Sequence, residues 1–537
     1  MSVTHTGLGS GAAARAARPP RAVVGSQVNA EEQIFAAFDG RILRRFWAFI
    51  SPYRRRLVLA VLAVLVFAGS QIAIPLILRS VIDRALVEGA LAEAAQAERL
   101  LAFGALLFFA IVTVNFFANL VQETLVARIA ERLLVDLRRA MYAHLQRVSL
   151  SFMDRTEVGR LMSRLQGDVH ALQEFLETSV FAIGDLVLLV GITIALLVLD
   201  WRLGLLTLSV VPILLVVRIL WIPRARRAFL RARVTSSTVN GALAEGIHGI
   251  RTVQGMGREA VNLRLFEDKV ADNLDAQLGG TWLAQIMVPI VDTLTGAALA
   301  IVVVVGGTAV LEDRLDLGVM VAFLFYVQRF FDPIRSLTMQ YSIMQRAMAS
   351  GQRIFEVLDV PLEVQDRPEA LDPADIDGSV EFKDVTFGYV RAMPVLKNVS
   401  FRVEPGETVA LVGPTGSGKT STMALLHRFY DVGSGQVLVG GHDVRDLAQA
   451  ALGRHIAMVL QDPFLFTGTV LENIRYATTR ATREQVIAAA TAVGAHDFIM
   501  RLPQGYETPL EQRGGNLSLG QRQLISFARA LVADARI

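Results

Sequence analysis

A glycine-rich octapeptide carries the clearest chemistry in this chain. It reads Gly413, Pro414, Thr415, Gly416, Ser417, Gly418, Lys419 and Thr420. The pattern GxxxxGK[ST] lets successive backbone N–H groups point toward an anion, and a following helix adds its positive dipole end. Lys419 is placed to reach β- and γ-phosphates, and the Thr420 hydroxyl to hold Mg²⁺. The loop, together with the adjacent Ser421, therefore predicts a binding site for the phosphates of a nucleotide and its Mg²⁺.

The flanking residues supply the elements that such a loop needs. Residues 408–412 are apolar and predict a buried strand directly before the loop, and a helical run begins at Ser421. Residues 379–389 alternate apolar and polar side chains, as expected for a half-buried strand. This strand–loop–helix order is the context that the motif requires. We therefore expect an α/β nucleotide-binding domain over residues 379–537.

The composition places the rest of the chain in lipid. Hydrophobic residues make up 53% of the 537 residues and charged residues only 19%, whereas soluble proteins carry about 25% charged residues. Six apolar stretches approach or exceed the roughly 20 residues that cross a bilayer. They lie at 57–78, 100–121, 181–199, 203–222, 283–308 and 317–338. The sequence thus predicts a six-helix membrane domain over 41–350 and a linker over 351–378.

Arginines set the expected orientation. They gather before the first span and in the long segments 122–180 and 223–281, whereas short turns at 200–202 and 312–314 carry one each. The positive-inside rule places the N-terminus, both long segments and the C-terminus in the cytosol. Residues 1–40 predict a disordered tail, with a mitochondrial transit peptide as the alternative. The net charge of +3 does not suggest a nucleic-acid binder, and the absence of cysteine excludes thiolate chemistry.

A second motif identifies a family resemblance. Asn516-Leu517-Ser518-Leu519-Gly520-Gln521 opens a helical run, and here the chain resembles the ATP-binding cassette (ABC) transporters, whose signature is LSGGQ. With six preceding spans, it resembles a half-size exporter of the bacterial multidrug and lipid-flipping type. The resemblance implies that Ser518 and Gly520 contact the γ-phosphate bound by a second protomer. Leu519 replaces the family's first glycine and contributes backbone at most, and Gln521 completes the motif.

The resemblance assigns further roles by position. Tyr389 matches the aromatic residue that stacks on adenine, although a strand tyrosine packed in the core is the alternative. Gln461 matches the glutamine that contacts Mg²⁺ and positions the attacking water. Segments 151–169 and 245–259 resemble the coupling segments at the tips of the two cytosolic arms, with ordinary structural turns as the alternative. Asp292, within a span, is a candidate for contact with a cationic substrate or a proton, or else a helix-packing acid.

The family pattern continues with a strand ending in Asp-Glu and then a switch histidine, and neither motif is found before Ile537. The four histidines of the α/β domain match no switch motif: His427, His442, His455 and His496. We therefore expect a sequence truncated before the Walker B strand. No catalytic base can be assigned in it, so hydrolysis by the chain as given is expected to be poor.

These observations lead to one main hypothesis about function. The chain is expected to drive ATP-dependent export or flipping of small hydrophobic or amphipathic substrates, as an ATPase-coupled transporter. It would work as a homodimer, or as a heterodimer with another half-transporter, among the lipids of the inner (cytoplasmic) membrane. Alternatives are a non-hydrolysing ATP-binding regulator, a nucleotide-gated channel, or the degenerate half of a heterodimeric transporter.

Overall fold

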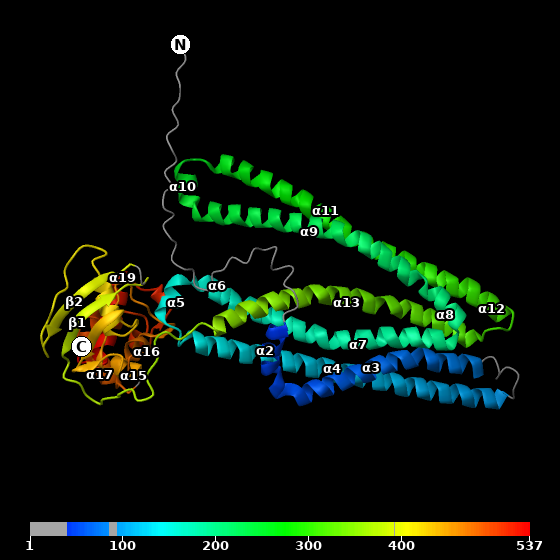
Figure 1. Ribbon diagram of the computed structural model, residues 1–537, viewed down its shortest axis with the longest axis horizontal. Helices are drawn as coiled ribbons and strands as arrows, with labels where there is room; N and C mark the ends of the chain where they lie inside the picture. Colours follow the sequence, from blue (N-terminus) through cyan, green and yellow to red (C-terminus); the bar gives the residue numbers. More distant parts are fainter. Residues whose placement is uncertain (1–39, 85–93, 391–392, 479) are drawn as a thin grey trace, which may run out of the picture. The chain divides into compact units, whose positions relative to one another are not determined.

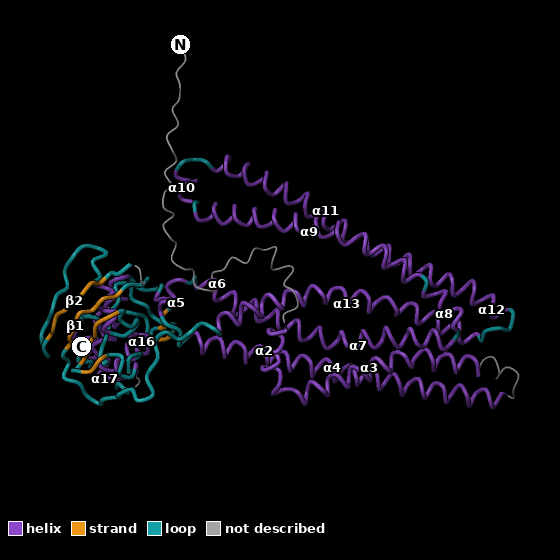
Figure 2. The backbone as a smooth tube through the Cα atoms, viewed as in Figure 1, coloured by secondary structure: helices purple, strands orange, loops and turns teal. Residues whose placement is uncertain are grey.

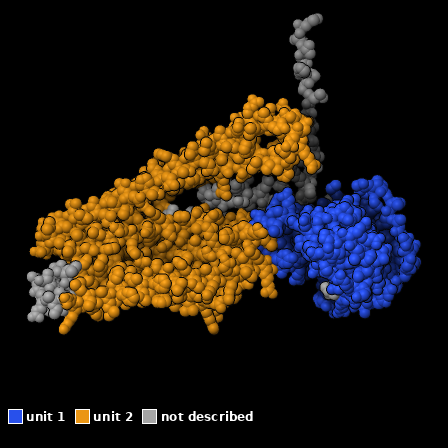
Figure 3. All heavy atoms as spheres, turned by 180° about the vertical axis from the view of Figure 1, so that it is seen from behind, with its two compact units in different colours: residues 1–27, 140–163, 355–537 blue, residues 28–139, 164–354 orange. Residues whose placement is uncertain are grey.

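Two compact units make up the chain. The computed structural model describes residues 40–84, 94–390, 393–478 and 480–537. Among these, unit 1 contains residues 140–163 and 355–537, and unit 2 contains the remaining residues up to 354 (Figure 3). The predicted disordered tail, apart from Gly40, lies outside the described residues.

Unit 2 consists of long apolar helices (Figure 1). Among the described residues, six helical segments are long and apolar enough to cross a membrane, which confirms the six predicted spans. The helices that begin or lie in this unit are α2 (Gly40–Ile50), α3 (Arg54–Val81), α4 (Ala94–Leu145), α7 (Val169–Leu199), α8 (Trp201–Leu208), α9 (Val210–His248), α10 (Ile250–Gly255), α11 (Glu259–Ile301), α12 (Gly307–Leu311) and α13 (Leu317–Leu358).

Packing within unit 2 follows the apolar sequence. Ile192, Leu196, Phe323 and Tyr326 are buried in one cluster contributed by α7 and α13, with further residues of α9 and α11. The Tyr326 hydroxyl donates a 2.6 Å hydrogen bond to the carbonyl of Ile72, so its burial leaves no unsatisfied donor. Many other apolar side chains, especially along α4, are exposed. That exposure is unfavourable in water and favourable in hydrocarbon.

Helices extend well beyond the spans. Helix α4 continues to Leu145, and α9 and α11 form a hairpin joined at α10. The long segments 122–180 and 223–281 are therefore helical arms, as their spacing predicts. Helix α13 also continues further than expected, to Leu358. The predicted linker consequently begins only at Asp359, and the name linker is used below for residues 359–378.

Unit 1 combines the end of the first arm with an α/β domain (residues 380–537). From the arm come α5 (Leu150–Arg155) and α6 (Val158–Ser163). The domain contains strands β1 (Val380–Phe387), β2 (Leu396–Val403), β3 (Ser434–Val439), β4 (His442–Asp443), β5 (Gly468–Thr469) and β6 (Pro509–Leu510). Its helices are α14 (Lys419–Leu426), α15 (Gln449–His455), α16 (Val470–Arg475), α17 (Arg483–Ala492), α18 (His496–Met500) and α19 (Leu519–Val532).

Among the described residues, all strands belong to this domain (Figure 2). An antiparallel sheet has the order β2-β1-β3-β4, and its central strand β1 pairs Val380 with Val403 on one side and Val439 on the other. The burial of β1 alternates much as its sequence predicts. A second core forms where α16 and α17 pack against α19. The first core lies at the sheet and includes Leu425 and Leu426 of α14, which follows the glycine-rich loop. The second core includes residues of α19, which follows the signature motif.

One predicted strand is absent. Residues 408–412 are not in a strand, and Val409, Leu411 and Val412 are exposed rather than buried. A buried strand of this type requires neighbouring backbone on both edges, and no pairing to this segment occurs in the described part of the chain. Apolar composition alone therefore gave the wrong prediction for this segment.

Candidate functional site

The glycine-rich loop is shaped by glycine at two positions. Gly416 and Gly418 have φ values of +88° and +93°, a backbone region that glycine adopts without the steric cost of a Cβ. A Cβ on Gly418 would also lie 2.5 Å from Leu396 Cδ2. Gly418 is the cap residue that precedes α14. The loop therefore leads directly into the first turn of a helix, whose free N–H groups attract anions.

Lys419 lies folded across the loop. Its Nζ donates to the carbonyls of Gly413 and Pro414, at 2.8 and 2.9 Å, and to Ser417 Oγ at 3.3 Å. No carboxylate pairs with Lys419 in the described residues. Neutral oxygens hold the ammonium at the loop without neutralising it, so its charge is available for a phosphate.

Tyr389 lies beside the first turns of α14. Its hydroxyl shares a 3.0 Å hydrogen bond with Ser421 Oγ, and Ser421 is buried. Tyr389 is 44% exposed, and its ring contacts those of Phe387 and Tyr430 edge-on. The structure thus brings the predicted adenine-stacking residue to the helix that follows the glycine-rich loop, with part of the residue accessible. The Ser421 hydroxyl is engaged by Tyr389.

The predicted Mg²⁺ ligands are Thr420 and Gln461. Both residues are exposed, and neither side chain makes a hydrogen bond among those recorded for the described residues. No group of three or more His, Asp or Glu side chains forms a metal site in the described ranges. Mg²⁺ commonly binds with few protein ligands plus phosphate oxygens and water. The hydroxyl and amide oxygens therefore fit a nucleotide-bound Mg²⁺.

The signature motif caps helix α19. Ser518 Oγ accepts from the Gln521 N–H at 3.3 Å, and Gln521 Oε1 accepts from the Ser518 N–H at 2.9 Å. This reciprocal capping box satisfies two N–H groups at the helix start. Gly520 carries no neighbour within 4 Å of a hypothetical Cβ, and Leu519 is 52% exposed. Ser518, Leu519 and Gly520 are exposed at this helix start, and Gln521 is half-buried.

The end of the first arm contacts the α/β domain beside this site. A cavity of about 1000 Å³ is lined by Tyr389, Thr420 and Tyr430 and by arm residues such as Asp154. The Tyr430 hydroxyl donates to Asp154. The name arm tip is used below for residues 149–156. The first of the two predicted coupling segments thus contacts the domain, and the second lies in unit 2.

Comparison with known proteins settles the family. Residues 57–334 match the model of the ABC transporter transmembrane region, and residues 396–537 match the model of the ABC transporter family. The chain belongs to the ABC transporters. Membership agrees with the resemblance drawn from the signature motif and the six spans, and it makes the protein an ATP-driven exporter with ATPase-coupled transport.

Several relatives align with this ABC transporter over most of its length. The uncharacterized ABC transporter ATP-binding protein YknV of Bacillus subtilis is 34% identical over 95% of this chain and 84% of its own. The ATP-dependent lipid A-core flippase of Syntrophus aciditrophicus is 33% identical over 78% of this chain and 69% of its own. A solved bacterial Atm1-family ABC exporter with ATP bound superposes with a TM-score of 0.70, at 26% identity, over 90% of this chain and 84% of that one.

Two further observations bear on the predicted residues of this transporter. Asp292 on α11 accepts a 2.7 Å hydrogen bond from Arg335 on α13, and both side chains are substantially exposed. This ion pair favours the helix-pairing interpretation of Asp292 over substrate contact. Ile537 pairs in parallel with the segment after α15, because its N–H bonds to the His455 carbonyl and its carbonyl to the Ala457 N–H.

Sequence reasoning missed three residues that connect the site to the arm. They are Glu363 in the linker, and Arg428 and Tyr430 shortly after α14. None belongs to the recognised motifs, and the partners by which they join domain, linker and arm are distant in sequence. One pattern in the sequence could have indicated Arg428: it is a charged residue two positions after the end of α14, where glycine is common.

Proposed function

We propose that this ABC transporter is one half of a dimer that exports or flips small hydrophobic or amphipathic molecules. Phosphates of ATP would bind the glycine-rich loop and Lys419, adenine would stack on Tyr389, and Thr420 and Gln461 would hold Mg²⁺. The observation that carries this proposal is the geometry of Lys419, an unneutralised cation at a loop that leads into a helix start. Such a site binds the triphosphate of a nucleotide.

The signature motif supports a dimer. Ser518 and Gly520 lie at the exposed start of α19, and the positive end of a helix there favours an anion. Within the described residues no recorded hydrogen bond joins residues 518–521 to the loop of the same chain. A second protomer, identical or related, would present its bound γ-phosphate to this helix start. Two ATP molecules would then lie between two α/β domains.

The membrane assignment rests on charge and hydropathy. Arginine-rich arms continue from the spans. The arms and the α/β domain would therefore lie on the cytosolic side of the cytoplasmic membrane. The relative from Syntrophus aciditrophicus is named an ATP-dependent lipid A-core flippase. Its name supports an amphipathic substrate for this chain.

A lipid-flipping assay tests the proposal. The intact protein is reconstituted in vesicles containing nitrobenzoxadiazole-labelled phosphatidylethanolamine, and dithionite reports which leaflet holds the label. ATP and Mg²⁺ are expected to move the label between leaflets, and Lys419→Ala is expected to abolish both this movement and ATP binding. Lys397→Ala is the matched control, because Lys397 is an exposed lysine on β2 outside the site. ATP-dependent flipping by Lys419→Ala at the wild-type rate would contradict the site assignment.

A further inference from the structure

The linker is bonded to the arm at its beginning. Glu363 Oε2 accepts hydrogen bonds from Ser149 Oγ at 3.2 Å and from Ser151 Oγ. These two serines lie at the start of α5, and both are buried. His144, at the end of α4, adds a 3.0 Å hydrogen bond from Nε2 to the Val360 carbonyl. One linker carboxylate therefore fixes the first residues of the arm tip.

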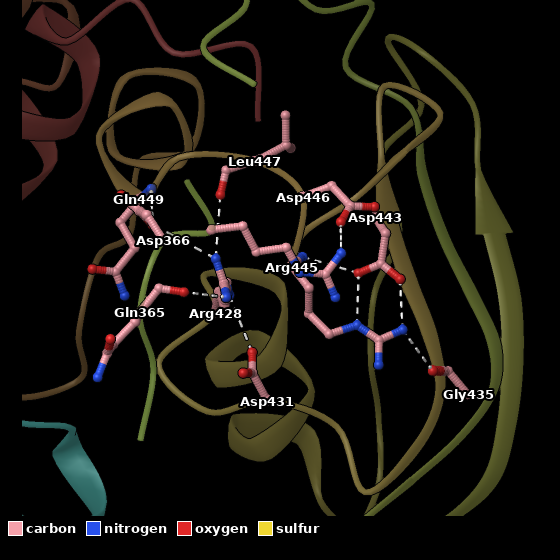
Figure 4. A network of polar contacts seen from close by, with 11 residues as sticks. Gln365, Asp366, Arg428, Asp431, Gly435, Asp443, Arg445, Asp446, Leu447 and Gln449 are labelled. Carbon is pink, nitrogen blue, oxygen red and sulfur yellow. Dashed lines mark hydrogen bonds and ion pairs between the residues drawn. The ribbon is translucent and has the colours of Figure 1, made fainter. Parts of the chain in front are cut away.

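Two residues further on, the linker is held by Arg428 instead (Figure 4). The Arg428 guanidinium donates to the Gln365 carbonyl at 3.0 Å and lies 3.7 Å from Asp366 Oδ1. It also bonds Asp431 at 3.1 Å and the Leu447 carbonyl at 3.2 Å. Its side chain is only 3% exposed. A buried charge is stable only when its partners surround it, and here linker atoms supply part of that shell.

The rest of the linker is pinned to the same surface. Asp366 Oδ1 accepts from the Gln449 N–H at 3.0 Å, and Arg367 pairs with Asp446. The Leu371 N–H donates to the Asp446 carbonyl at 2.8 Å. The segment from 365 to 371 thus belongs structurally to the α/β domain. Residues 360–363, by contrast, are bonded to the arm.

Arg428 stands at a backbone position that favours glycine. Helix α14 ends in a Schellman motif, since the Arg428 N–H bonds to the Leu425 carbonyl and the Phe429 N–H to the Ala424 carbonyl. Arg428 takes the left-handed position of that motif, with φ +52°, where glycine is favoured and other residues are strained. The contacts of its guanidinium with Gln365, Asp366, Asp431 and Leu447 explain why an arginine occupies this position. Arg428 lies two residues after the end of α14, the helix whose first turn carries Lys419.

We propose that Arg428 and Glu363 act in series as positioning residues that link the nucleotide site to the arm tip through the linker. Arg428 fixes the linker relative to the end of α14, and Glu363 fixes the arm tip relative to the linker. A displacement of α14 on nucleotide binding is then transmitted to Ser149 and Ser151. This inference rests on nucleotide binding at the proposed site.

Amide hydrogen exchange of the full chain tests this relay, with Mg²⁺ and the non-hydrolysable analogue AMP-PNP as the probe. In the unmodified protein, the probe is expected to change exchange in the peptide 144–155 by about threefold or more. Glu363→Gln weakens the acceptor, and more than half of this response should disappear while the Kd for AMP-PNP stays unchanged within about twofold. Glu369→Gln is the matched control, since Glu369 is an exposed linker carboxylate with no contact recorded among the described residues.

Arg428→Gly provides an independent variant. Glycine relieves the left-handed backbone and keeps the helix end, so the variant removes the guanidinium with little penalty to the Schellman motif. It is expected to lose the arm-tip response, and Arg428→Lys to recover only part of it, since an ammonium lacks the planar fork. The double variant with Glu363→Gln should lose no more than Arg428→Gly alone, because residues in series are not additive.

The outcomes separate the relay from the nucleotide site. Unchanged arm-tip responses in Glu363→Gln and Arg428→Gly, or additive losses in the double variant, would overturn the relay. A wild-type protein that binds AMP-PNP without any change in peptide 144–155 would overturn it as well. Failure of the wild-type protein to bind AMP-PNP would instead overturn the proposed nucleotide site and the relay with it.

Discussion

The hydroxyl of Tyr430 donates a hydrogen bond to the carboxylate of Asp154 and so joins the α/β domain to the arm tip across 276 residues of sequence. The Tyr430 ring lies edge-on to Tyr389, with centroids 5.2 Å apart. Burial raises the pKa of the Tyr430 phenol, and the hydrogen bond to Asp154 raises it further. The phenol therefore stays protonated and remains a donor throughout the physiological pH range.

Tyr430→Phe is expected to detach this contact without disturbing the aromatic cluster. The ring is kept and only the hydroxyl is lost, so stability should fall by about 1 kcal/mol and ATP affinity should not change. Hydrogen exchange in peptide 144–155 should accelerate. Tyr476→Phe serves as the control, because Tyr476 is an exposed tyrosine that stacks on Phe466. Equal exchange rates in both variants would show that the Asp154 contact does not hold the arm tip.

The sequence was sufficient for features that depend on local spacing. Six spans follow from runs of apolar residues, and the capping box of α19 follows from a serine with glutamine three residues later, as at Ser518 and Gln521. The loop was recognisable because Gly418 must adopt a positive φ. Each of these features is decided within a few residues of chain.

Other features depend on partners that no local pattern specifies. The bonds of Glu363 to Ser151 and of Arg428 to Gln365 join segments far apart in sequence. The strained backbone of Arg428 is tolerated only because the fold supplies partners for its side chain. The strand prediction for residues 408–412 was wrong, because a strand forms only beside neighbouring strands, and apolar composition does not show whether these are present.

Gly418→Ala is expected to weaken ATP binding strongly. The substitution places a Cβ on a residue with left-handed backbone and against Leu396. The loop must therefore shift, and its N–H groups no longer point toward the phosphates. We expect the Kd for ATP to rise by more than about tenfold.

Gly453→Ala is the matched control, because Gly453 lies in α15 with no atom within 4 Å of the new Cβ. That variant should bind ATP normally and gain up to about 1 kcal/mol of stability. Equal affinities for the two variants would contradict the loop geometry.

Substitutions of Ser518 separate its capping role from its proposed phosphate contact. Ser518→Ala should cost about 1 kcal/mol, because the cap of α19 is lost. Ser518→Asp keeps a capping oxygen and should largely preserve the melting temperature. Its negative charge should, however, repel the partner's γ-phosphate and prevent dimerisation in AMP-PNP, measured by light scattering.

Thr482→Asp is the control for added charge at a cap, because Thr482 begins α17 with the same capping box outside the motif. This variant should dimerise normally. If Ser518→Asp also dimerises as well as the wild-type protein, the signature motif does not contact phosphate across the interface.

His427, at the C-terminal end of α14, should make stability depend on pH. Burial lowers the pKa of its imidazole, so the folded chain binds a proton less readily than the unfolded chain, whose histidine pKa is about 6.5. The stability of neutral His427 is therefore fully present above pH about 6.5 and is lost as the pH falls toward the lower folded-state pKa. The melting temperature of the α/β domain, followed in the intact protein, should decrease between about pH 7 and pH 5.

His427→Gln should flatten this decrease in melting temperature. His442→Gln, at an exposed position on β4, should leave it unchanged. Parallel pH profiles for His427→Gln and the wild-type protein would assign the acid sensitivity to other groups.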